Sequence, residues 1–269
     1  MTHTAGFAYG IQGGGDVDGL YRDADVWRAE SLAEMSRRVA GCPLAYQPGS
    51  RWHYSLSMDL QGAVIERLTG QSLPDFMQER LFGPLGMTDT AFYTPPDKVS
   101  RRATLYLGGP GGGLTPTPNP LMRDMEHTPA AASGGGGLIS TALDYARYGQ
   151  LLLNGGIWGG RRIVSADALK LQMSNHLADT ILEQGFFVGH QRIRPGFGYG
   201  FNGVVFTDPV QAGIPVGTGT YHWDGAAGTW FWVDPENDLL FVGMIQLLSA
   251  NAPPVQAMTQ TLMADAIVR

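Results

Sequence analysis

Residues 220–246 read TYHWDGAAGTWFWVDPENDLLFVGMIQ, and this stretch decides the fold class. Short runs of aromatic and β-branched residues are broken at Gly225, at Gly228 and at the Asp-Pro-Glu-Asn-Asp sequence of residues 234–238. Runs of this length and composition, separated by turn residues, are typical of successive antiparallel strands. The stretch FGYGFNGVVF at 197–206 has the same character. We therefore expect an antiparallel sheet in the C-terminal part of the chain.

The residues before about 190 have helical spacing instead, with apolar side chains three and four positions apart. The predicted helices cover residues 27–39, 58–69, 72 to about 81, 142–154, 165–173 and about 254–268. Gly70 is expected to cap the second helix, and Ser72 and Ser165 to open the third and fifth. The second helix carries its apolar residues, Leu60, Val64, Ile65 and Leu68, on one face. Residues 94–137 are rich in glycine and proline and are expected to form loops.

Helices first and hairpins last predict an α+β fold, in which an antiparallel sheet is flanked by helices and joined to an all-helical lobe. We expect a single domain over residues 1–269. Its helical and loop lobe is predicted at approximately 20–190, and its sheet part at approximately 191–269.

The composition excludes several classes of function. Eighteen basic against 24 acidic residues give a net charge of −6, and no basic block is present, so nucleic-acid binding is not expected. No stretch approaches the roughly 18 apolar residues of a membrane span. Cys42 is the sole cysteine. No secretory leader is visible, which favours the cytoplasm for the chain as written; a leader ahead of Met1 would instead indicate a periplasmic or secreted protein.

The stretch YSLSMDLQGAVIERLTG at 54–70 places a tyrosine in the turn before an amphipathic helix. Such a turn can direct the phenol of Tyr54 into a cleft. A cation nearby would lower the pKa of this phenol from its usual value of about 10 and allow general-base catalysis. The residues alone leave open the alternative that Tyr54 packs its ring and hydrogen-bonds locally.

Two glycine-rich stretches are further candidates for the site. Gly225 and Gly228 would let a substrate approach the strand backbone, whose free N–H groups could bind an oxyanion; the alternative is an ordinary glycine-rich hairpin. The glycines at 134–137 precede a helix but lack the Gly-Lys-Ser/Thr of a phosphate-binding loop. A tight loop is therefore favoured over a phosphate site there.

Together these stretches resemble the serine β-lactamase and penicillin-binding-protein superfamily, and most closely its class C-like esterases, the family VIII carboxylesterases. The resemblance covers nearly the whole chain. It rests on five segments: His3-Thr4-Ala5-Gly6, Tyr54-Ser55-Leu56 with Glu66-Arg67-Leu68-Thr69-Gly70, Leu-Phe-Gly-Pro-Leu-Gly-Met at 81–87, Gly-Gly-Leu-Ile-Ser-Thr-Ala at 136–142, and Trp223-Asp224-Gly225.

The resemblance implies acyl transfer through a covalent serine ester, without a metal or cofactor. Tyr54 would be the general base or proton relay, and the backbone N–H of Ala226 would donate to the oxyanion. Trp223, Asp224 and Gly225 would line the pocket for a small-molecule ester or a β-lactam-like substrate. This chemistry needs no histidine.

Two positions depart from the family pattern. Leu56 is expected to contact the substrate. It stands where β-lactamases carry a small polar residue that holds the β-lactam amide, so the resemblance implies that esters are favoured over penicillins as substrates. Asp224 stands where glycine or threonine is common. His3 and His222 are expected to have structural roles.

The lysine count shows that the nucleophile motif of the resembled family is not in this sequence. The family's Ser-x-x-Lys motif needs serine three residues before lysine, but Pro95 precedes Lys98 at that spacing and Asp167 precedes Lys170. The sequence has no Gly-x-Ser-x-Gly either. We therefore expect the nucleophile helix and the first strands of the sheet in a segment ahead of Met1 or in a companion chain.

Two other functions stay open at this point. One is a non-catalytic, penicillin-binding-like module that holds peptidoglycan-like or acyl ligands without turnover. The other is a β-lactamase, acyltransferase or D-peptidase on the same scaffold. The sequence does not indicate the oligomeric state.

Overall fold

The computed structural model describes residues 1–11, 15–109, 111–119, 125–189, 191–249 and 252–267. Its contacts divide the chain into two compact units. Unit 1 comprises Met1–Gly83, Thr90–Ser100 and Leu121–Ile139, and unit 2 comprises Pro84–Asp89, Arg101–Pro120 and Ser140–Arg269. No helix in the described ranges is long and apolar enough to cross a membrane.

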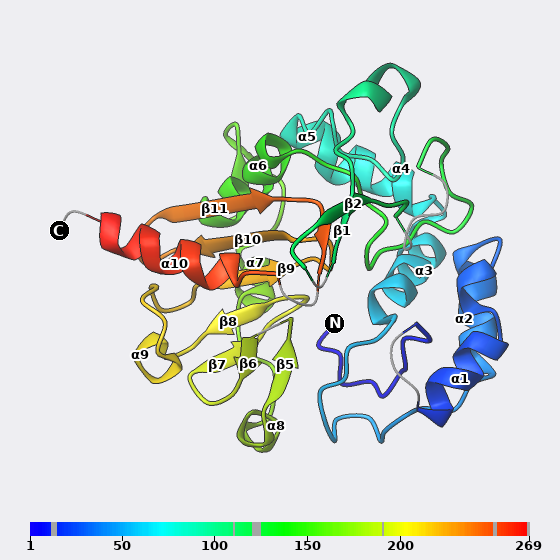
Figure 1. The fold of residues 1–269 in the computed structure, drawn as a ribbon, viewed down its shortest axis with the longest axis horizontal. Helices are drawn as coiled ribbons and strands as arrows, with labels where there is room; N and C mark the ends of the chain where they lie inside the picture. Colours follow the sequence, from blue (N-terminus) through cyan, green and yellow to red (C-terminus); the bar gives the residue numbers. More distant parts are fainter. Residues whose placement is uncertain (12–14, 110, 120–124, 190, 250–251, 268–269) are drawn as a thin grey trace. The chain divides into compact units, whose positions relative to one another are not determined.

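Unit 1 is built from helices and connecting loops (Figure 1). Gly70 ends α3 in the left-handed conformation with φ 70°, and the Ser72 hydroxyl accepts a hydrogen bond from the Asp75 N–H, so both predicted caps are confirmed. The elements are α1 (Asp16–Asp23), a 3-10 turn η1 (Val26–Arg28), α2 (Leu32–Ala40), α3 (Ser57–Thr69), α4 (Leu73–Met77), a π-helical turn η2 (Gln78–Phe82), α5 (Gly83–Leu85), which continues into unit 2, and a 3-10 helix η3 (Pro96–Arg101).

The continuous helix predicted for residues 27–39 is wrong. Ser31 interrupts it, because the Ser31 side chain accepts a hydrogen bond from the Glu34 N–H while the Glu34 carboxylate accepts one from the Glu30 N–H. This reciprocal arrangement caps a new helix N-terminus. The helix therefore begins at Leu32, and the residues before it form the separate turn η1.

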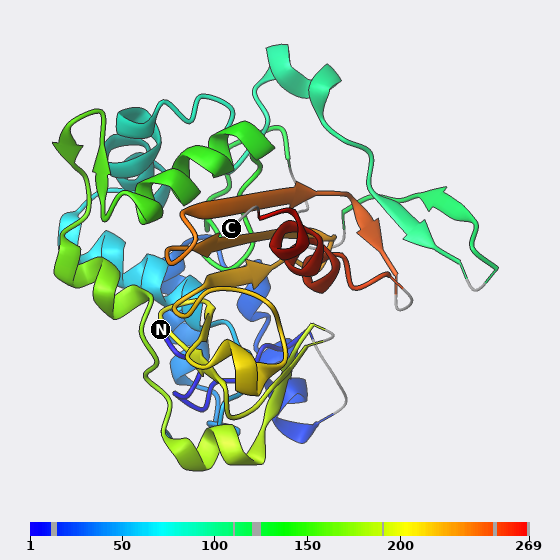
Figure 2. The ribbon, with the colours of Figure 1, turned by 90° about the vertical axis from the view of Figure 1, so that its left-hand side faces the viewer.

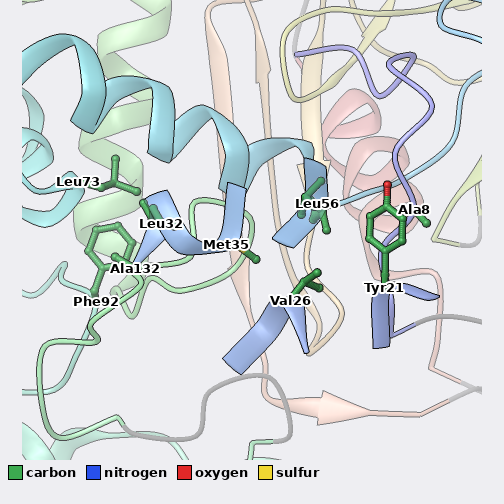
Figure 3. Packing of buried hydrophobic residues seen from close by; sticks show 10 residues of the cluster. Ala8, Tyr21, Val26, Leu32, Met35, Leu56, Leu73, Phe92 and Ala132 are labelled. Carbon is green, nitrogen blue, oxygen red and sulfur yellow. The ribbon is translucent and has the colours of Figure 1, made fainter. Parts of the chain in front are cut away.

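The core of unit 1 forms where α3 packs against α2 and α4 (Figure 3). Only part of the apolar stripe predicted for α3 faces this core. Leu60 and Ile65 pack against it. Val64 is 55% exposed and Leu68 is 79% exposed. Gly62 also lies on the packed side, where a Cβ would come within 2.9 Å of the Leu73 side chain. The small residue thus sets how closely the neighbouring side chains approach α3.

Unit 2 contains a five-stranded sheet in the order β11-β10-β9-β8-β7, and every pairing in it is antiparallel, as predicted. The elements are β1 (Tyr106–Gly108), β2 (Leu114–Pro116), α6 (Ala142–Leu153), β3 (Ile157–Trp158), β4 (Arg161–Arg162), α7 (Ala166–Gln172), α8 (Asp179–Gln184), β5 (Phe186–Val188), β6 (Gln191–Ile193), β7 (Phe197–Tyr199), β8 (Val204–Phe206), α9 (Pro209–Ala212), β9 (Tyr221–Asp224), β10 (Thr229–Asp234), β11 (Leu239–Met244), β12 (Leu247–Leu248) and α10 (Val255–Ala266).

The local predictions for unit 2 agree with the structure in most places. Residues 235–238 form the hairpin turn between Asp234 and Leu239, and the Ser165 hydroxyl caps α7. The prediction of loops throughout 94–137 is wrong at η3, which is a 3-10 helix, and at the strands β1 and β2. These two strands pair with each other, and β1 also pairs with β12. Positions 110, 120–124 and 268, which fall within the predicted loop and the predicted terminal helix, lie outside the described residues.

Helices cover the two faces of this sheet, α10 on one side and α6 on the other (Figure 2). Along β10 the side chains alternate between them. The indole N–H groups of Trp230 and Trp232 donate to Thr259 on α10, whereas the ring of Phe231 lies 5.0 Å from that of Tyr145 on α6. Both faces of β10 are thereby buried, which explains its run of aromatic residues.

Replacing Gly243 by alanine should destabilise unit 2. Gly243 pairs with Trp230 across β10 and β11, and a Cβ at residue 243 would overlap the Trp230 indole. Overpacking of this kind costs about 1–3 kcal/mol. Urea denaturation should show a lower midpoint for Gly243→Ala and an unchanged one for Gly113→Ala, where a Cβ meets nothing within 4 Å. Equal midpoints for the two variants would contradict this account.

Candidate active site

Tyr54 stands immediately before α3, and three rings of unit 1 surround its ring. The ring of His3 lies 4.6 Å from it, that of Tyr9 5.3 Å and that of Trp52 6.2 Å, between centroids. The backbone also fixes this entry to the helix, since the His53 N–H donates to the His3 carbonyl over 2.8 Å. Both alternatives weighed for Tyr54 therefore have a structural basis: the ring is packed, and the phenol has polar neighbours.

His3 supports the segment around Tyr54 and carries no charge. The Ser55 N–H donates to Nδ1 of His3 over 3.3 Å, and the Ser55 hydroxyl is hydrogen-bonded to the Ser57 hydroxyl over 2.7 Å. Burial lowers the pKa of His3 to about 3, so the ring is neutral at physiological pH. A neutral, buried ring with a backbone partner agrees with the predicted structural role.

Leu56 caps the core beneath this segment. Its side chain is fully buried and belongs to the hydrophobic cluster of unit 1, together with Ala8 and Tyr21 (Figure 3). A side chain without exposed surface contributes packing in this position. The role in substrate binding assigned to Leu56 from sequence stays a prediction, and the core position does not support direct contact.

The glycine-rich loop at 134–137 is a close-packed loop against the start of α3. A Cβ at Gly134 would lie 2.5 Å from the Met58 carbonyl oxygen, so only glycine fits there. The Ser133 hydroxyl donates to Oδ1 of Asp59 over 2.5 Å, and the Gly135 N–H donates to the same oxygen over 3.3 Å. The loop is thus bound to α3 through a buried carboxyl group.

Asp59 and Tyr9 are two polar residues near Tyr54 that sequence reasoning missed. Asp59 is 1% exposed, and burial raises the pKa of its carboxyl. A cavity of about 30 Å³ borders Asp59 and Ser133. Asp59 could have been found from the sequence, because it is an acidic residue in the first part of the helix that follows Tyr54. No local pattern marks Tyr9, because only the tertiary structure brings it to Tyr54.

The Trp-Asp-Gly stretch is placed in unit 2, at the end of β9. Trp223 packs edge-on against Tyr199, with ring centroids 5.7 Å apart. The Asp224 carboxylate lies against Gly189 between β5 and β6, where a Cβ would come within 2.6 Å of Oδ2. The Gly225 N–H donates to the Thr229 carbonyl over 2.7 Å and closes the turn between β9 and β10.

Ala226 lies at the tip of this turn and is exposed. Within the residues that the structure describes, its N–H donates to no other group, while Gly225, Gly228 and the Ala227 carbonyl all take part in backbone hydrogen bonds. An exposed N–H that donates to no described group is available to an acceptor. In the same described ranges, no group of three or more histidine, cysteine, aspartate or glutamate residues could hold a metal ion.

The fold and these segments define the class of protein. The chain has an antiparallel sheet between helices and a tyrosine just ahead of α3. In addition, residues 1–263 match the family described as Beta-lactamase. The chain belongs to the Beta-lactamase family, and the superfamily predicted from its motifs is confirmed.

Curated relatives extend the comparison beyond the family. Protein Rv1367c of Mycobacterium tuberculosis is 35% identical over an alignment of 261 positions, which covers 91% of this chain and 61% of that protein. Esterase EstB of Burkholderia gladioli is 33% identical over 248 residues, 86% of this chain and 59% of EstB. Lovastatin esterase of Penicillium rubens is 30% identical over an alignment of 286 positions, which covers 98% of this chain and 67% of that esterase. The chain thus spans about 60–67% of the length of these relatives.

Solved structures confirm the predicted fold class. EstCE1, a hydrolase with promiscuous acyltransferase activity, superposes with a TM-score of 0.78 at 26% identity, over 98% of this chain and 69% of EstCE1. Simvastatin synthase LovD of Aspergillus terreus, unliganded, superposes with a TM-score of 0.77 at 23% identity, over 98% of this chain and 66% of LovD. The second likeness concerns the fold alone.

Proposed function

We propose that this chain supplies most of the acyl-transfer machinery of a serine hydrolase that acts on small carboxylic esters. The observation that carries the proposal is the position of Tyr54: its ring is held among those of His3, Tyr9 and Trp52, in the loop just ahead of α3. The similarity to EstB and to lovastatin esterase, whose names state an esterase, supports the substrate class.

The reaction assigns a separate role to each residue. A serine hydroxyl attacks the ester carbonyl and transfers its proton through Tyr54, and the alcohol leaves with a proton, so that a serine ester remains. Water then hydrolyses this ester and regenerates the hydroxyl. The Ala226 N–H would stabilise the negative oxygen of each tetrahedral intermediate, and Trp223, Asp224 and Gly225 would shape the pocket.

We propose further that the attacking serine lies outside these 269 residues. The sequence holds no Ser-x-x-Lys, and the relatives are longer than this chain. A preceding segment or a companion chain would supply the motif. The preference for esters over β-lactams stays the expectation from sequence, because Leu56 offers no polar group where β-lactamases hold the β-lactam amide.

The 269-residue chain alone should hydrolyse p-nitrophenyl acetate and butyrate no faster than buffer does. The same chain produced together with a segment carrying Ser-x-x-Lys should hydrolyse them, and Ser→Ala in that motif should abolish turnover. A serine-directed phosphonate should label the assembled protein stoichiometrically and leave the isolated chain unlabelled. Turnover by the isolated chain that the phosphonate abolishes would place the nucleophile within these residues and contradict the proposal. Absence of labelling and turnover in the assembled protein would instead favour a non-catalytic binding module.

A further inference from the structure

Tyr9 occupies a position in unit 1 that its backbone holds unusually firmly. Its N–H donates to Oδ1 of Asp18 over 3.2 Å, and the following Gly10 N–H donates to the same oxygen over 2.7 Å. Its carbonyl accepts a hydrogen bond of 2.9 Å from the indole N–H of Trp27. Residues from α1 and η1 thus fix a loop position on both sides of its Cα, which leaves little freedom for the ring that follows.

The ring of Tyr9 is held between two other rings. It lies edge-on to Trp27, with centroids 5.4 Å apart and an interplanar angle of 73°, and it lies 5.3 Å from the ring of Tyr54 at 53°. The phenol groups of Tyr9 and Tyr54 are hydrogen-bonded to each other. Because its backbone and its ring are both held in place and its phenol already has a partner, Tyr9 is a preorganised hydrogen-bond donor.

The environment decides which phenol donates. Burial, reinforced by the charges of Tyr54 and Asp59, raises the pKa of Tyr9 far above its usual value, so Tyr9 keeps its proton. Among the described residues, the titratable groups that act on Tyr9 are Tyr54 and Asp59, and the Asp18 carboxylate binds its backbone. The imidazole ring beside Tyr54 is that of His3, which is neutral. When Tyr54 gives up its proton, the Tyr9 O–H is left as the donor to the phenolate oxygen.

We propose that Tyr9 is a positioning residue that donates a hydrogen bond to the phenolic oxygen of Tyr54 and thereby holds that oxygen ready to accept the proton of the nucleophile. This inference rests on the proposed function of Tyr54. A hydrogen bond to the charged form of an acid favours that form, and bonds to an ionised partner are about twice as strong as neutral ones. Removal of the donor should therefore make Tyr54 a weaker relay without removing it from the site.

The test uses Tyr9→Phe in the assembled protein with the nucleophile segment. We expect kcat/KM for p-nitrophenyl butyrate to fall roughly 10- to 100-fold, chiefly in kcat, and the ascending limb of the pH–rate profile to move up by about one pH unit. Tyr46→Phe is the matched control, because it removes a phenolic oxygen from a tyrosine of unit 1 that packs against His53. It should leave both kcat/KM and the pH–rate profile unchanged. A Tyr9→Phe variant with wild-type kcat and an unmoved profile would overturn the proposal.

A second arm does not depend on turnover. Tyrosine labelled with carbon-13 at Cζ reports the titration of Tyr54, whose signal is assigned by its loss in Tyr54→Phe. Tyr9→Phe should raise the midpoint of this titration, and an unchanged midpoint would refute the hydrogen bond even if the esterase proposal failed. Should Tyr9→Phe not fold, 3-fluorotyrosine at position 9 keeps the packing and donates more strongly. It should lower the midpoint, and no shift would again refute the proposal.

Discussion

Replacing Tyr54 by phenylalanine is expected to lower kcat/KM for p-nitrophenyl butyrate by roughly 10²–10⁴ in the protein that carries the nucleophile. Positioned general acid–base groups contribute about this factor to proton transfer. The substitution keeps the ring, so its packing against His3 and Trp52 persists and only the phenolic oxygen is lost. The loss should therefore appear in the acylation step and not in the fold.

Acylation can be measured directly as the rate of labelling by a serine-directed phosphonate. In Tyr54→Phe this rate should fall with kcat/KM, whereas the melting temperature should stay near that of the wild type. Trp52→Phe tests the ring packing without removing the relay, and we expect its effect on kcat/KM to be much smaller. A Tyr54→Phe enzyme within fivefold of wild type, properly folded, would show that another group carries the proton.

The second large effect is a loss of stability in acid that originates at His222. This residue of β9 is 1% exposed, its Nδ1 is hydrogen-bonded to the amide nitrogen of Gln256 on α10, and its ring lies 5.3 Å from Phe206. Burial lowers the pKa of His222 to about 3. In the unfolded chain the same ring titrates near 6.5, as histidine usually does.

The sign of the effect follows from proton uptake. Between pH 6.5 and about 3 the unfolded chain binds a proton at His222 that the folded protein does not, so protonation favours unfolding. The stability is fully present above about pH 6.5 and falls by about 1.4 kcal/mol per pH unit below it. The total loss from this residue is on the order of 4 kcal/mol near pH 3.

Urea unfolding from pH 3 to pH 8 checks this prediction by comparison with His222→Asn, whose side-chain oxygen can stand in for Nδ1. The free energy of unfolding of the wild type should fall more steeply in acid than that of the variant, by about one bound proton. Parallel curves would show that His222 binds protons equally in the folded and unfolded states and would contradict the prediction. His222 is preferred to His3 for this test, because the raised pKa of Asp59 in unit 1 acts with the opposite sign and would offset the His3 effect.

Predictions of helix ends and turns were correct where the interaction joins residues that are close together in the sequence. Gly70 and Ser72 terminate and start helices through bonds to residues at most four positions away, and Asp234 starts a hairpin turn through its bond to Asn237. The same kind of reasoning was wrong for residues 27–39, because the period of the apolar residues outweighed the capping signal at Ser31. Correct use of that signal would have placed the helix start at Leu32.

The sequence by itself determined the class of this protein: its strands, its caps and the order of its motifs each depend on residues close together in the chain. Only the tertiary structure decided which side of α3 is buried and which rings enclose Tyr54, because His3 and Tyr9 reach it from a distant part of the sequence. The spacing of apolar residues predicts that a helix has two different faces, but it does not predict which part of the protein will pack against each face. Contacts between distant residues arise from packing of the whole core, and no local window of sequence contains that information.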